Sequence, residues 1–61
     1  MFQVFCVVTK IRSQKVLSVM PVSSRYKALS EAEQMQGRLS GISNGEHLSG
    51  GRYKVYQVRK V

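Results

Sequence analysis

The sequence predicts a small α+β domain with the element order β-β-α-β, in which a three-stranded antiparallel sheet carries one helix on one face. Three observations predict this fold. The first residues form a Phe- and Val-rich run, residues 14–22 and 52–61 are typical of two further strands, and an apolar stripe at helical spacing lies between those two segments. The 61 residues are enough for a single domain, 1–61.

The first strand is predicted at residues 2–11, FQVFCVVTKI. Alternation places one set of apolar side chains on one face: Phe2, Val4, Cys6 and Val8. Phe5 and Val7 lie on the other face. Strands that are apolar on both faces are usually central in a sheet, so we expect this strand in the middle.

The second strand is predicted at residues 14–22, QKVLSVMPV, after a two-residue turn at Arg12-Ser13. This turn sets a register with the opposed pairs Lys10–Lys15, Val8–Leu17, Cys6–Val19 and Phe5–Met20. Pro21 cannot donate a ladder hydrogen bond, so it ends the strand or marks it as an edge strand.

A helix is predicted at about residues 31–40, with a start near Arg25 as an alternative. Ser30 and Glu33 have the spacing of a capping box, and Gly41 suits the position that follows a helix. The apolar stripe consists of Ala28, Ala32, Met35, Leu39 and Ile42. We expect this stripe to pack on the sheet.

Residues 40–51 are expected to form a loop or a small hairpin that turns at Asn44-Gly45, and residues 52–61 a third strand. If the third strand lies beside the first, the strand order is 2-1-3. The sequence leaves open which face of residues 52–61 meets the helix. Apolar side chains on the uncovered face form a candidate protein interface: Phe5, Val7, Val16 and Met20.

Small domains usually need additional stabilisation, and the chain has one cysteine and one histidine. A disulfide within the chain is excluded, and two such residues are too few for a structural zinc site, so no metal or cofactor is expected. We therefore expect a homodimer. A single cysteine within a strand is typical of a reducing compartment, which favours the cytoplasm, and no membrane partner is expected because the apolar run 1–8 is too short to span a bilayer.

We do not expect an enzyme. Nucleophilic catalysis needs a nucleophile with a base in hydrogen-bonding reach, and Cys6 with His47 is the one conceivable pair. Cys6 lies within an apolar strand, where burial makes a thiol unreactive. No glycine-rich phosphate-binding loop precedes the helix.

The net charge of +7 indicates a polyanionic partner, and nucleic acid, either DNA or RNA, is the leading candidate. Cations interleaved with tyrosine are typical of proteins that hold phosphates and stack unpaired bases. We expect phosphate contacts from Arg12, Lys15, Arg52, Lys54, Arg59 and Lys60, and base stacking on Tyr53. The alternative is a protein-interaction module, an inhibitor or adaptor of a host protein, that uses the uncovered sheet face or a strand edge.

The run FQVFCVVTK, a short second strand, the run SSRYKALSEAEQM and a terminal strand together resemble the short basic proteins of unknown function found in phage and prophage genomes. The resemblance covers most of the chain and rests on this pattern. It implies a role in binding nucleic acid or in redirecting a host protein, and it transfers no functional residues.

Overall fold

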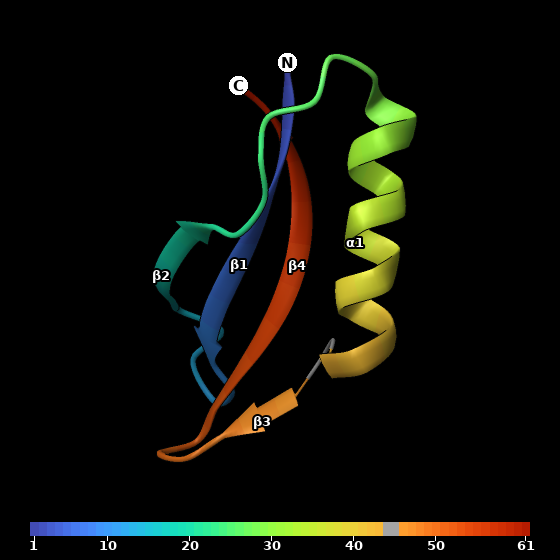
Figure 1. Cartoon of the computed structure of the whole chain (residues 1–61). Coiled ribbons are helices and arrows are strands. Elements are labelled where there is room, and N and C mark those ends of the chain that lie inside the picture. Colours follow the sequence, from blue (N-terminus) through green and yellow to red (C-terminus); the bar gives the residue numbers. More distant parts are fainter. Residues whose placement is uncertain (44–45) are drawn as a thin grey trace.

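A computed structural model describes residues 1–43 and 46–61, with the side chains of residues 1–41 and 47–61. Its elements, in chain order, are β1 (Phe2–Lys10), β2 (Val16–Pro21), α1 (Leu29–Ser43), β3 (Glu46–Leu48) and β4 (Arg52–Lys60). The strands form one antiparallel sheet in the order β2-β1-β4-β3. Figure 1 shows α1 along one side of β1 and β4, and β2 on the other side. The predicted α+β class is confirmed, whereas the prediction of three strands is wrong.

The fourth strand comes from residues expected to lie in a loop. Glu46–Leu48 pairs with β4, with Leu48 opposite Arg52. The turn between them contains Gly50 and Gly51 at φ 80° and 70°, a backbone conformation that glycine adopts without steric cost. The turn expected at Asn44-Gly45 lies outside the described residues.

β1 is the central strand, as predicted. It pairs with β4 over its whole length, from Phe2 opposite Lys60 to Lys10 opposite Arg52. The chain ends continue this ladder, because the Val61 N–H donates to the Met1 C=O at 2.8 Å. β2 pairs with the other side of β1, so both edges of β1 are hydrogen-bonded.

The predicted register between β1 and β2 holds at the turn and is wrong beyond it. The Lys10 N–H donates to the Lys15 C=O at 2.9 Å, in agreement with the predicted pair. An irregularity between Val8 and Thr9 then shifts the pairing by one residue, so that Met20 lies opposite Cys6 and not opposite Phe5. A shift of one residue moves a side chain to the other face of a sheet. A β-bulge of this kind leaves no residue-type signal in this sequence.

The connection between β1 and β2 is also longer than predicted. The ladder closes at Lys10 and Lys15, which leaves residues 11–14 as the loop in place of a two-residue turn. Gln14 ends this loop at φ 56°, in the left-handed region.

The helix exists as predicted, but both its ends differ. It starts at Leu29, so Ser30 lies inside it and not at its cap, and it continues through Gly41 to Ser43. Within the expected stripe, Ala32 is buried and Met35 and Leu39 are half-buried, whereas Ala28 is exposed. Packing on the sheet has extended the helix beyond the residues with the strongest local signals.

The core of the described chain is small and centres on Val4 of β1 and Ala32 of α1, each 0% exposed. Val58 lies opposite Val4 on the same face of the sheet, and it also faces α1. The helix face of β4 therefore carries Tyr56 and Val58, which settles the question that the sequence left open. In the described residues, no helix is long and apolar enough to cross a membrane.

Replacement of Val4 by alanine tests this core. We expect Val4→Ala to lower the free energy of unfolding by about 2 kcal/mol, because it removes two buried methyl groups and leaves a cavity. Val61→Ala is the matched control, since Val61 is 45% exposed, and it should change stability by less than about 0.5 kcal/mol. Urea denaturation of the two variants measures both values, and equal losses would contradict this description of the core.

Candidate nucleic-acid interface

The structure divides the predicted phosphate-binding residues into separate groups. Arg12, Lys15 and Arg52 lie at the end of the molecule that carries the β1–β2 and β3–β4 turns, and Tyr53 lies beside them. Arg59 and Lys60 lie near the opposite end of β4, about 23 Å from Arg52 at roughly 3.3 Å per residue. The predicted set is therefore not one continuous surface.

The turn-bearing end holds four cations, and we call this group the basic tip: Lys10, Arg12, Lys15 and Arg52. The backbone fixes their proximity. Lys10 is the cross-strand partner of Arg52 and its N–H donates to the Lys15 C=O, so three cations follow one another across adjacent strands. Neighbouring strands are about 4.8 Å apart, so the three backbone positions span roughly 10 Å.

The two turns are joined directly, which makes the basic tip one unit. The Ile11 N–H donates to the Gly51 C=O at 2.9 Å. A shallow hollow lies between the turns, lined by Lys10, Ile11, Arg12, Gly50 and Gly51. The Arg52 Nε–H donates to the Ser49 C=O at 2.9 Å, which holds the Arg52 side chain against the β3–β4 turn.

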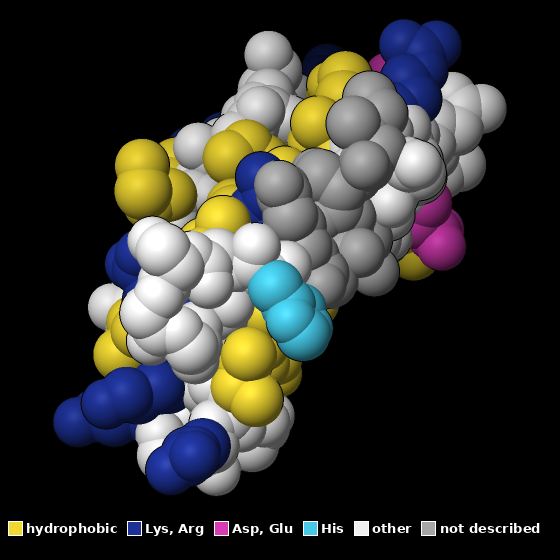
Figure 2. Space-filling view, turned by 90° about the horizontal axis from the view of Figure 1, so that it is seen from below, with side chains coloured by type: hydrophobic (Ala, Val, Ile, Leu, Met, Phe, Trp, Pro, Cys, Tyr) yellow, Lys and Arg dark blue, Asp and Glu magenta, His cyan; other side chains and the backbone are white. Residues whose placement is uncertain are grey.

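The charge of the molecule is unevenly distributed. Glu31 and Glu33, two of its three acids, lie in the first turns of α1, at the end opposite the two turns (Figure 1). Figure 2 views the molecule from the turn-bearing end and shows Lys and Arg side chains at the lower left, where no acidic side chain is visible, and others at the upper right, on the side that also carries acidic side chains. Like charges opposed across strands destabilise a sheet, so the basic tip has an electrostatic cost in the free protein.

Tyr53 is tied to the β1–β2 loop. Its hydroxyl donates to the Gln14 Oε1 at 2.9 Å, and the Gln14 Nε2–H donates to the Ile11 C=O at 2.6 Å. These two bonds offset part of the cost of Gln14 at φ 56°, which is about 1 kcal/mol for a residue other than glycine. Tyr53 is half-buried, and its side chain lies on the face of the sheet opposite to Lys10 and Arg52.

The remaining predicted cations face other surroundings. The Lys54 Nζ lies 5.9 Å from the centroid of the Tyr56 ring, on the helix face of β4. The Arg59 guanidinium lies 5.8 Å from the centroid of the Phe5 ring, on the opposite face, and Arg59 Nη2 also donates to the Gln57 Oε1 at 3.1 Å. Each of these side chains covers an aromatic ring instead of extending towards the basic tip.

The predicted protein interface is divided as well. Phe5, Val7 and Val16 share the face of the sheet away from the helix, but Val7 is only 3% exposed. Met20, opposite Cys6, lies on the helix face because of the shifted register, and it is 61% exposed. The prediction that these four residues form one surface is therefore wrong for Met20.

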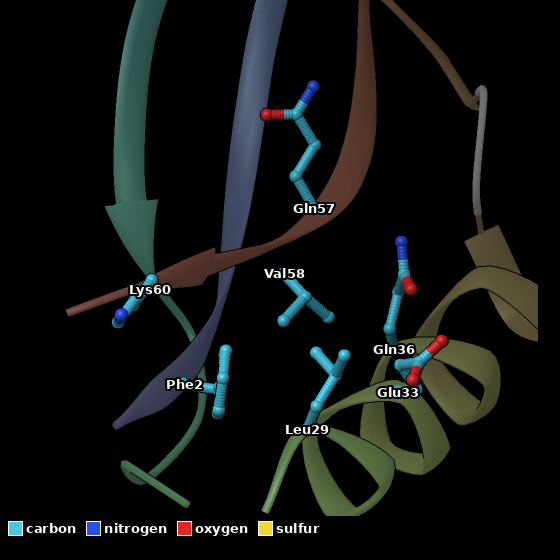
Figure 3. A pocket seen from close by; sticks show the side chains of 7 residues that line it. All are labelled: Phe2, Leu29, Glu33, Gln36, Gln57, Val58 and Lys60. Carbon is cyan, nitrogen blue, oxygen red and sulfur yellow. The ribbon is translucent and has the colours of Figure 1, made fainter.

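The sheet separates the two residues considered for catalysis. Cys6 lies on the helix face, opposite Tyr56, whereas His47 lies opposite Tyr53 and so faces the other side. A second hollow lies between α1 and the sheet, where Leu29 and Val58 point toward one another (Figure 3). Glu33 is the one carboxylate in its lining, which includes neither Cys6 nor His47.

The sequence prediction omitted one member of the basic tip, Lys10. The signal was available, because antiparallel pairing of the first and last strands brings the end of one beside the start of the other. The positions of Arg59 and Lys60 far from the tip follow from the same pairing.

Comparisons with protein-family models, with curated proteins and with solved structures found no match to this chain.

Removal of one cation from the basic tip tests whether repulsion among these cations destabilises the free protein. We expect Lys10→Gln to raise the free energy of unfolding at low ionic strength by about 0.5 kcal/mol, since it relieves repulsion from Arg52. The gain should vanish near 1 M salt, where the Debye length falls to about 3 Å. Lys27→Gln, outside the tip, is the control. A gain for Lys10→Gln that persists at high salt would rule out repulsion as its cause.

A double-mutant cycle tests the bond between Tyr53 and Gln14. We expect Tyr53→Phe and Gln14→Ala each to destabilise the protein, with a coupling free energy of about 0.5 to 1 kcal/mol from their shared hydrogen bond. Chemical denaturation of the wild type, the single variants and the double variant gives this quantity. Strictly additive losses would show that the bond contributes nothing to stability.

Proposed function

We propose that this chain is a non-catalytic nucleic-acid-binding protein whose basic tip contacts the phosphate backbone. The observation that carries the proposal is the run of three cations, Lys15, Lys10 and Arg52, on neighbouring strands, with Arg12 in the adjoining turn. Such an arrangement lowers the stability of the free protein. A bound polyanion would neutralise these charges and release condensed counterions from the nucleic acid, which favours association.

Phosphates are the best-supported part of the ligand. The tip joins cationic side chains to a glycine turn, and Arg52 is held in place by its bond to the Ser49 C=O. Tyr53 is a half-buried residue at the same end of the sheet, held to the β1–β2 loop by its bond to Gln14, and it is the candidate for contact with an unpaired base. We therefore expect affinity to come mainly from charge, with a modest preference for single strands.

Fluorescence anisotropy tests the proposal. The protein is titrated into labelled single-stranded RNA, single-stranded DNA and duplex DNA over a range of salt concentrations. If the four tip cations neutralise four phosphates, the logarithm of the binding constant should fall with the logarithm of salt concentration at a slope of about −3.6 on duplex and about −2.8 on single strands. A slope near zero would contradict the proposal.

Two triple variants separate the basic tip from the general charge. Lys10→Ala, Arg12→Ala and Lys15→Ala together remove three exposed tip cations, whereas Arg25→Ala, Lys27→Ala and Arg38→Ala remove three exposed cations elsewhere. The two proteins have the same net charge. We expect the tip variant to lose at least about tenfold in affinity and most of the salt slope, and the control to lose much less. Equal losses would mean that charge acts without a defined site.

A protein-interaction module remains the competing function. If this function is correct, the protein should bind nucleic acid weakly, without preference for its type, and should lose that binding at moderate salt. A stoichiometric protein partner should also remain bound after nuclease treatment. Neither triple variant should then change capture of that partner, unless the basic tip itself forms the interface.

A further inference from the structure

β2 is the most exposed apolar element in the described chain. It forms one edge of the sheet, and all six of its residues are exposed. Five of the six are apolar, and their exposed fractions include 52% for Val16 and 61% for Met20. Val22 extends the apolar run beyond the strand and is 43% exposed. Exposed apolar edge strands are templates for pairing with another strand.

The two edges of the sheet differ in how far other residues of the chain cover them. At the β4 edge, β3 pairs with residues 52–54, and the Gln36 Nε2–H of α1 donates to the Tyr56 C=O at 2.8 Å. At the β2 edge, the described residues outside β1 supply no comparable cover, and Figure 1 shows α1 on the far side of β1 from β2. The β4 edge is therefore covered in part by the chain's own residues, whereas the β2 edge is open.

The ladder shows which backbone groups of β2 point outward. The Val22 N–H donates to the Val4 C=O at 3.0 Å, and hydrogen-bonded pairs alternate along an antiparallel ladder. With Met20 opposite Cys6 and Ser18 opposite Val8, the backbone groups of Ser18 and Met20 face β1. Those of Val19 and Pro21 therefore face the open edge. Pro21 has no N–H to offer there, so between Ser18 and Val22 the Val19 N–H and C=O form the complete donor and acceptor pair.

The absence of charge on β2 indicates which partner pairs with this edge. Residues 16–24 contain no charged side chain, although the whole chain carries +7. A second copy approaching the basic tip would meet like charges, whereas at β2 two copies meet through uncharged surfaces. We propose that β2 pairs antiparallel with β2 of a second copy, about a twofold axis that passes through Val19.

This arrangement pairs the open backbone groups of Val19. The Val19 N–H of each copy donates to the Val19 C=O of the other, and Met20 of one copy lies beside Ser18 of the other on the same face. Lys15 then lies opposite Ser23 of the second copy, so no cation faces a cation. Pairing uses the β2 edge of both copies, so this contact forms a closed dimer with a sheet of eight strands.

The interface is short, so the dimer is weak. Six residues from each copy bury less than the roughly 1,200 Å² of a stable specific interface. Pro21 removes one further hydrogen bond. We therefore expect association in the micromolar range or weaker. This inference does not depend on nucleic-acid binding by the basic tip.

Amide hydrogen exchange followed by NMR, together with sedimentation equilibrium, tests the dimer. On going from dilute protein to a roughly hundredfold higher concentration, the Val19 amide should exchange about tenfold more slowly or more as dimers form. The Ser18 and Met20 amides, which bond to β1, should not change. Sedimentation should show the matching shift from monomer to dimer.

Two variants locate the interface. Val19→Lys sets two cations together on the twofold axis and should weaken association by about fivefold or more, with an unchanged circular dichroism spectrum. Leu29→Lys, at a site 46% exposed on α1, should leave association unchanged. A strict monomer at every concentration would overturn the proposal. So would equal weakening by both variants, or protection of the Val19 amide only after a different protein or a nucleic acid is added.

Discussion

The pairing of β1 with β4 constrains the rest of the structure. It joins the two ends of the chain through nine consecutive residue pairs, and every other element depends on it. β2 adds to the free side of β1, β3 adds to β4, and α1 packs where Val4 and Val58 lie side by side. Few apolar residues are fully buried, so this long ladder has a large part in defining the fold.

The same ladder creates the candidate site. Because β1 and β4 pair in full register, the end of β1 lies against the start of β4, and the turns that follow and precede them meet. Lys10 and Arg52 are opposed for this reason, and the bond between Ile11 and Gly51 locks the two turns together. The pairing of β1 with β4 therefore places like charges on adjacent strands, which lowers the stability of the free protein.

Sequence patterns predicted the elements of the fold that long apolar runs determine. They identified the central strand, predicted at residues 2–11 and found at Phe2–Lys10, and the apolar contacts of α1 at Ala32 and Leu39. They missed the features of the sheet that depend on the backbone conformation of single residues. The bulge beside Val8, which moved Met20 to the helix face, and the three-residue strand β3 both belong to local hairpins, where the backbone conformation of one or two residues sets the pairing. Of the basic tip, the predicted phosphate contacts included Arg12, Lys15 and Arg52 and left out Lys10, although the predicted hairpin set Lys10 opposite Lys15.

A titration of isotope-labelled protein with a short single-stranded oligonucleotide, followed by NMR, tests the central claim most directly. We expect the amide shifts to change at residues 11–15 and 49–53, on both turns of the basic tip, with little change in α1 or at Arg59. Saturable changes confined to those turns would support binding by the basic tip. Changes centred on β2 or α1, or none at moderate salt, would contradict it.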